Sequence, residues 1–265
     1  MGNGAHGVRW GMRAVLIYAM PMTQRSGANT EKDASANATA GAGANPAQAS
    51  DAHHAHDQTA AVALATELAS GSSAINVEDY VNQLSDTRDG DAKAEQAAHV
   101  VEELANQKPE LLAPHIETFV ALLAGSRPQS ARPATMQVAV HSLPILARVA
   151  PAKVAKHLKT LQAAFPTAAA LSKDGLVRTF VALCVASVTY QKRLIENFEL
   201  ALRTADPEQL PRWVEHILPA LKGEPYAQAR AVVEQRLNDP QLERSVAQHV
   251  ADTIGVKLRI APDRR

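Results

Sequence analysis

Residues 106–123 read NQKPELLAPHIETFVALL, and RVAPAKVAKHLKTLQAAF at residues 148–165 repeats their pattern 42 positions later. Apolar and proline positions coincide in the two copies, whereas most polar positions differ. The matching pairs are Leu104 and Leu146, Pro109 and Pro151, Leu112 and Val154, His115 and His157, Ile116 and Leu158, Phe119 and Leu161, and Leu123 and Phe165. In the first copy, the apolar spacing places Leu112, Ile116, Phe119 and Leu123 on one face of a helix, which needs neighbouring helices to cover it.

The pattern continues beyond the second copy. Leu183, Leu194 and Phe198 lie 40 positions after Leu143, Val154 and Leu158, and a looser fourth copy starts near Arg212. A helix pair of about 40 residues that cannot bury its own apolar face, repeated several times, is typical of stacked helical repeats.

The repeats resemble the HEAT/armadillo class over residues 91–255, with Pro109 and Pro151 at the start of the second helix of a pair. SKDGLVRTFVALC at 172–184 and DPEQLPRWVEHILPAL at 206–221 are similar to the later part of a group of HEAT-like proteins, many of them prokaryotic, without assigned activity. Residues 173–177 depart from the Arg-Asp-Asn-Gly-Val that is more usual in that group. The resemblance implies an all-α, right-handed α-solenoid of about four helix pairs, and it implies no activity.

Composition and helix-start signals agree with an all-α fold, because the chain is rich in alanine and only 4% aromatic. Asn76 and Asp91 are predicted N-caps, and Asp206, followed by Pro207 and Gln209, predicts a capping box that Asp239 repeats in part. The predicted helices are 76–86, 91–106, 109–124, 133–148, 151–165, 173–188, 190–204, 208–221, 225–237 and 240–254.

The repeat domain is expected to span residues 76–258. Residues 1–75 form a predicted low-complexity arm, disordered except for a marginal helix at 59–69, because residues 23–57 contain almost no large apolar side chain. Residues 259–265 are a predicted disordered tail. No run of about 18 apolar residues occurs, so we expect no membrane span. The single cysteine, Cys184, fits a reducing compartment, and we expect a cytoplasmic protein.

Three histidines in DAHHAHD at 51–57, namely His53, His54 and His56, are of a type that binds Zn²⁺. The low-complexity flanks supply no framework to orient the rings, so we expect no dedicated metal site and no cofactor. The chain also lacks the G-x-S-x-G, P-loop, G-x-G-x-x-G and H-E-x-x-H patterns, and we assign no catalytic residue.

The charge of the chain is balanced overall, with 27 basic and 27 acidic residues, but it is unevenly distributed. Residues 67–117 carry eleven acidic and three basic residues, whereas residues 147–193 carry eight basic residues and one acidic residue. The candidate binding-surface residues are Lys153, Lys156, Lys159, Arg178, Lys192, Arg193 and Trp213.

Two functions follow from this pattern. The first is a non-enzymatic scaffold that binds an unidentified protein partner through the second helices of the repeats. The alternative is a nucleic-acid-binding protein that uses the basic residues of 148–193, resembling the alkylpurine DNA glycosylases, which also need aromatic side chains and a catalytic acid. Trp213 and Asp174 are the residues of those types near this region. A solvated charged face without any ligand is the third reading of the same residues.

Overall fold

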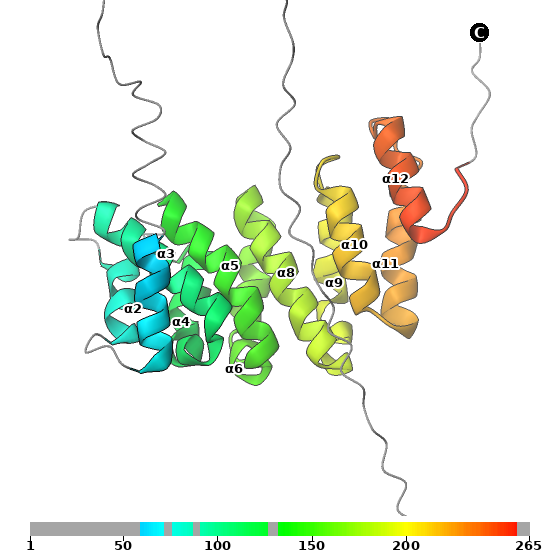
Figure 1. Ribbon diagram of the computed structural model, residues 1–265. Coiled ribbons are helices and arrows are strands. Elements are labelled where there is room, and N and C mark those ends of the chain that lie inside the picture. Colours follow the sequence, from blue (N-terminus) through cyan, green and yellow to red (C-terminus); the bar gives the residue numbers. More distant parts are fainter. Residues whose placement is uncertain (1–58, 72–75, 87–90, 127–131, 259–265) are drawn as a thin grey trace, which may run out of the picture. The chain divides into compact units, whose positions relative to one another are not determined.

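The computed structural model describes residues 59–71, 76–86, 91–126 and 132–258, and every regular element in these residues is a helix (Figure 1). The prediction of an all-α fold is therefore confirmed, whereas the predictions for residues 1–58 and 259–265 lie outside the described residues. The helices are residues 59–70, α2 Val77–Ser85, α3 Asp91–Gln107, η1 Pro109–His115, α4 Ile116–Leu123, α5 Pro133–Val149, α6 Pro151–Ala155, α7 Leu158–Ala164, η3 Phe165–Thr167, α8 Ala170–Ala186, α9 Val188–Thr204, α10 Leu210–Ala220, α11 Gly223–Arg236 and α12 Arg244–Ile254.

Contacts between these helices fall into two series. In the first series α3 contacts α5, α5 contacts α8, α8 contacts α10, and α10 contacts α12 (Figure 1). In the second series α2 contacts η1, α4 contacts α7, and α9 contacts α11. The two series are joined within successive pairs, for example where α8 contacts α9 and α10 contacts α11. Each predicted helix pair therefore places one helix in each series.

The repeated apolar positions form the core, as the sequence predicts. Leu112, Ile116, Phe119 and Leu123 are all at most 3% exposed, and their counterparts in the next copy are buried as well. The aromatic side chains link the pairs, because Phe180 lies 6.0 Å from Phe165 and 6.4 Å from Phe198 between ring centroids. Aromatic pairs at such distances add stability beyond the area that they bury.

Two predicted helices are interrupted at equivalent positions. The helix expected at 109–124 is a 3-10 helix up to His115 and an α-helix from Ile116, and the helix expected at 151–165 breaks at His157. His115 (φ −101°, ψ 14°) and His157 (φ −97°, ψ 9°) adopt nearly the same backbone conformation. Pro114 has no N–H to donate in the first copy, but Lys156 stands there in the second, so proline is not required for this break.

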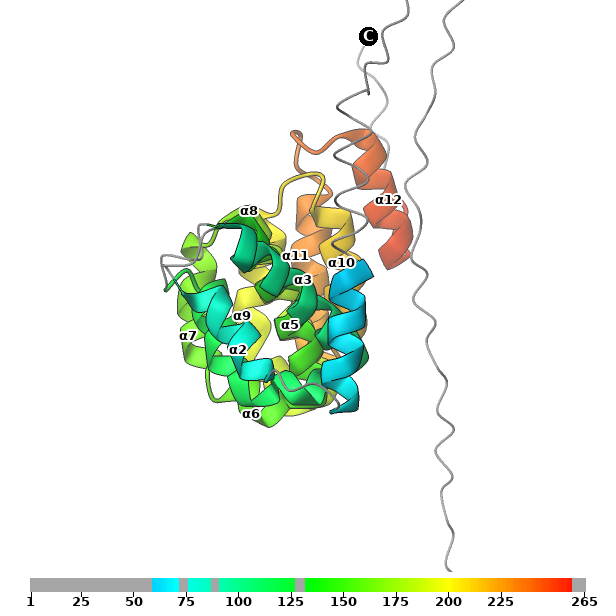
Figure 2. The ribbon, with the colours of Figure 1, turned by 60° about the vertical axis from the view of Figure 1, so that its left-hand side comes forward.

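The helix at residues 59–70 belongs to the packed unit, which corrects the predicted start of the domain at residue 76. Ala61, Ala65 and Leu68 are at most 8% exposed and form part of the common core. Lys108 also donates a 2.7 Å hydrogen bond from Nζ to the carbonyl oxygen of Ala69. Figure 2 shows this helix (blue) in the view turned from that of Figure 1. The expectation of a marginal helix does not account for this buried stripe of two alanines and a leucine at helical spacing.

The predicted N-caps have different outcomes. Asn76 caps α2, and Asp79 completes a capping box by accepting from the N–H of Asn76. The predicted box at Asp206 is wrong, because α10 begins at Leu210 without a side-chain cap and the 206–209 segment is a turn. Pro211 explains the shift: it lacks an N–H and fits the first turn of a helix, whereas a start at Pro207 would place it in the interior.

The second Asp-Pro pair also forms a turn. The Oδ1 of Asp239 accepts a 2.9 Å hydrogen bond from the backbone N–H of Gln241, and α12 begins only at Arg244. The predicted helix start at residue 240 is therefore wrong. The aspartate satisfies a local turn instead of a helix terminus, which short polar side chains do equally well.

Cys184 is buried in α8 at 2% exposure, and burial raises the pKa of its thiol to about 12. We expect the native protein to react with Ellman's reagent at pH 8 at a rate at least ~100-fold below that of a free thiol, because only the thiolate attacks and it is scarce and inaccessible. Adding guanidinium should release one reactive thiol per chain. Fast reaction without denaturant would contradict the buried position.

None of the described helices is both long enough and apolar enough to cross a membrane.

Candidate interaction surface

Five basic side chains lie exposed on α7 and α9 of the second series and on α6, which directly precedes α7, and we call them the basic strip. Lys153 lies in α6, Lys156 lies between α6 and α7, and Lys159 lies in α7. Lys192 and Arg193 lie in the first turns of α9. On the same segments, the intervening Val154, Leu158, Leu161 and Leu194 are buried. The apolar side chains thus fix the segments against the core and leave the basic side chains in solvent.

Gln162 connects the two parts of the basic strip. From α7 it donates a 2.9 Å hydrogen bond to the carbonyl oxygen of Arg193 and a 2.8 Å hydrogen bond to Oδ1 of Asn197, both in α9. These two bonds show that α7 and α9 lie side by side at this point. The charges of Lys159 and Arg193 therefore belong to neighbouring elements of one surface.

Within the described part of the chain, no carboxylate forms an ion pair with any of the five side chains of the basic strip. Other arginines are neutralised locally: Arg203 lies 2.7 Å from Glu199, and Arg230 lies 2.8 Å from Glu234. The strip consequently keeps a positive potential that can attract an anionic partner.

Arg178 does not belong to the basic strip, so its prediction as part of the same binding surface is wrong. It projects from α8, in the first series of helices, and its charge acts on His216 of α10. Partial burial removes water from the imidazole of His216 and lowers its pKa, and the charge of Arg178 lowers this pKa further. His216 therefore stays largely neutral at pH 7 beside a permanent cation.

Trp213 is only 1% exposed, so its prediction as a binding-surface residue is wrong. Its indole Nε1 donates a 3.0 Å hydrogen bond to Oδ1 of Asp174, and Arg212 donates a 2.7 Å hydrogen bond to the same oxygen. The side chain of Asp174 is 11% exposed. A buried indole usually has such a partner, so this trio joins α8 to α10 as an internal contact. Asp174 and Trp213 are 39 residues apart, so no local sequence pattern indicates that their side chains form a hydrogen bond.

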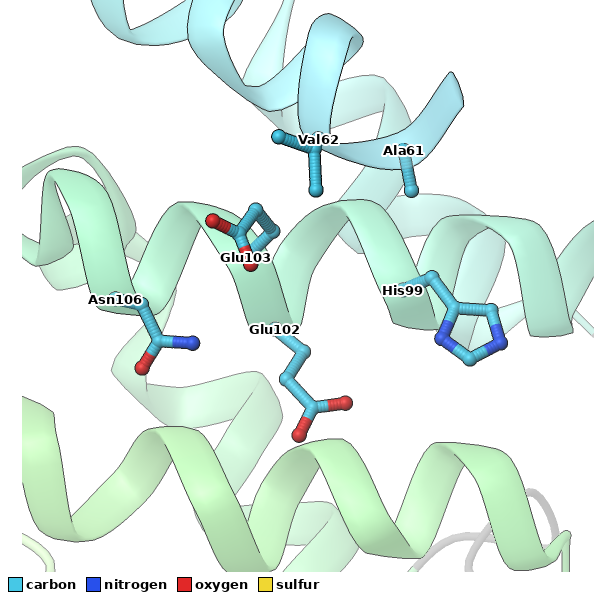
Figure 3. A pocket seen from close by; sticks show the side chains of 6 residues that line it. All are labelled: Ala61, Val62, His99, Glu102, Glu103 and Asn106. Atoms are coloured by element: carbon cyan, nitrogen blue, oxygen red, sulfur yellow. The ribbon is translucent and has the colours of Figure 1, made fainter. Parts of the chain in front are cut away.

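A polar groove of about 290 Å³ lies where the helix at 59–70 passes over α3 (Figure 3). Ala61 and Val62 form its apolar wall, and α3 contributes the polar side chains, which are His99, Glu102, Glu103 and Asn106. His141 of α5 contacts two of these side chains, with Nε2 2.9 Å from Oδ1 of Asn106 and Nδ1 3.7 Å from Oε1 of Glu102. No sequence pattern predicts this groove, because one of its walls belongs to the helix at 59–70, which the sequence places in the N-terminal arm.

The groove does not provide a metal centre. In the part of the chain that the structure describes, no three His, Cys, Asp or Glu side chains are arranged to hold a metal ion. The histidines considered from the sequence, His53, His54 and His56, lie outside the described residues.

Comparison with known proteins adds no family to this description. No family model matches the chain, and no curated protein or solved structure has significant similarity to it.

Proposed function

We propose that this chain is a non-enzymatic scaffold of the HEAT/armadillo type, a right-handed solenoid of stacked helix pairs. Its function is to bind an acidic protein segment along the basic strip, in the cytoplasm. The observation that carries this proposal is the set of five exposed basic side chains that lack ion pairs in the described residues. Support also comes from the two series of helix contacts, which stacked repeats produce.

The nucleic-acid alternative would use the same basic strip, but other observations favour a protein partner. Proteins that bind single strands or extruded bases offer exposed aromatic side chains for stacking. Trp213 is buried, and Asp174 already accepts hydrogen bonds from Trp213 and Arg212. Neither side chain is presented to a nucleotide in this arrangement.

Fluorescence anisotropy tests the proposal with a labelled Glu/Asp-rich peptide of about 12 residues at ~50 mM salt, where surface electrostatics are weakly screened. Replacing Lys153, Lys156 and Lys159 by alanine should weaken binding at least ~10-fold, because each exposed charge contributes up to about 1 kcal/mol. The control variant replaces Lys222, Arg244 and Lys257, which are exposed on other elements, by alanine and removes the same charge.

A labelled DNA duplex serves as the competing probe in the same assay. Binding of the peptide that the strip variant loses and the control variant keeps supports the proposal. Binding of DNA alone, with a steep loss between ~50 and ~200 mM salt, would favour the nucleic-acid alternative. No binding of either probe would leave the basic strip as a solvated face and overturn the proposal.

A further inference from the structure

We infer that the acidic partner of the basic strip is a second copy of this chain, paired antiparallel through the second series of helices. This inference rests on the proposed function, since it uses the same strip as a protein-binding surface. It adds the identity of the partner and the symmetry of the complex.

The first observation is a pair of equal and opposite charge blocks. Among the described residues, those between 59 and 126 include ten acidic and two basic residues, a net charge of −8. Those between 132 and 193 include nine basic residues and one acidic residue, a net charge of +8. A partner that matches both blocks must carry the same two charges in the opposite order, and a second copy does so when it is turned end for end.

The second observation is that exposed acidic side chains also lie on the second series of helices, which carries most of the basic strip. Glu78 of α2, Glu110 of η1 and Glu117 of α4 are exposed, and we call them the acidic strip. No ion pair within the described ranges involves these three carboxylates. Because α2 contacts η1 and α4 contacts α7, the helices that carry the acidic strip are neighbours of each other and of α7, which carries Lys159 of the basic strip.

Symmetry favours a closed dimer. A two-fold axis near the boundary of α4 and α7 would place each acidic strip on the basic strip of the other copy, so that both pairs form in one isologous interface. A head-to-tail contact would satisfy only one pair and leave the other strip open at each end. The antiparallel arrangement therefore satisfies more of the exposed charge.

Apolar contact area is available beside the basic strip. Val188 is 60% exposed and lies four residues before Lys192, so both side chains are on the same face of α9. Val185, at the end of α8, is 71% exposed. Exposed charge pairs alone contribute little to affinity, and these valines would add buried apolar surface to the electrostatic match.

Light scattering coupled to size-exclusion chromatography tests this inference on the full chain. At ~50 mM salt we expect a mass of twice the 28.3 kDa of one chain, and at ~500 mM salt the mass of the monomer, because screening weakens exposed pairs. A monomer at both salt concentrations would overturn the inference.

Two charge-reversal variants make the test specific. Lys153→Glu/Lys156→Glu/Lys159→Glu/Lys192→Glu/Arg193→Glu makes both strips acidic, and Glu78→Lys/Glu110→Lys/Glu117→Lys makes both strips basic. Each variant alone should be monomeric at ~50 mM salt, because like charges would face each other, whereas an equal mixture should form a heterodimer. Circular dichroism checks that both remain folded.

The outcomes separate this inference from the proposed function. A dimer that persists in either reversed variant alone, or a mixture that stays monomeric, would overturn the antiparallel pairing. A monomeric wild-type chain that still binds the acidic peptide through the basic strip would overturn the dimer and leave the proposed function standing. A chain that neither dimerises nor binds the acidic peptide would overturn both the antiparallel dimer and the proposed function.

Discussion

Replacing Gly175 by valine is expected to lower the free energy of unfolding by about 3 kcal/mol, because α8 has no room for a side chain at this position. A Cβ atom built on Gly175 would lie 3.0 Å from Cδ1 of Leu123 and 3.1 Å from both Cα and Cγ2 of Val140. The Cα of Val140 belongs to the backbone of α5 and cannot rotate away. Valine would therefore force α5 and α8 apart, and urea unfolding monitored by circular dichroism measures the cost.

Two further variants separate this steric effect from helix propensity. Gly175→Ala should lose about 1 kcal/mol, since its gain of about 1 kcal/mol in helix propensity is outweighed by the close contacts. Ala170→Val introduces the same β-branched side chain at an exposed position of α8 and should change stability by less than about 1 kcal/mol. If Gly175→Val unfolds within about 0.5 kcal/mol of the wild-type protein, the close approach of α5 and α8 is wrong.

Most of the helices could be predicted from the sequence, because their positions depend on local signals. Apolar spacing and proline positions place the second helix of each pair close to its observed bounds, and Asn76 caps α2 as predicted. Where two local signals compete, the prediction fails: Asp206 and Pro207 suggest a helix start that Pro211 forbids. Glycine is an unfavourable residue in a helix interior, and only the contact with Val140, 35 positions away, explains Gly175.

The candidate surface was only partly predictable, because it depends on which helices become neighbours. The lysines at 153, 156 and 159 share one short segment, and their exposure follows from the buried positions between them. Arg178 and Trp213 were grouped with them by charge and size, but α8 and α10 belong to the other series of helices. The polar groove was missed for the same reason, since Ala61 and His99 meet only in the folded chain.

Replacing Gln191 by leucine is the second change with a large expected effect, a loss of about 3 kcal/mol in the free energy of unfolding. Gln191 is 2% exposed, and its amide bonds three backbone groups. Nε2 donates to the carbonyl oxygens of Ala220 at 2.9 Å and Cys184 at 3.3 Å, and Oε1 accepts from the N–H of Lys222 at 3.0 Å. Leucine keeps the volume but leaves the two buried carbonyl oxygens without this partner, and an unsatisfied buried group costs about 1–3 kcal/mol.

Gln162→Leu is the matched control, because it removes the same amide from a half-buried position. Water can replace its bonds to Arg193 and Asn197, so we expect a loss below about 1 kcal/mol. Urea unfolding of both variants gives the comparison. Equal losses would mean that the burial of Gln191 is unimportant, whereas a larger loss for Gln191→Leu would show that this amide joins the end of α8 to the connection between α10 and α11.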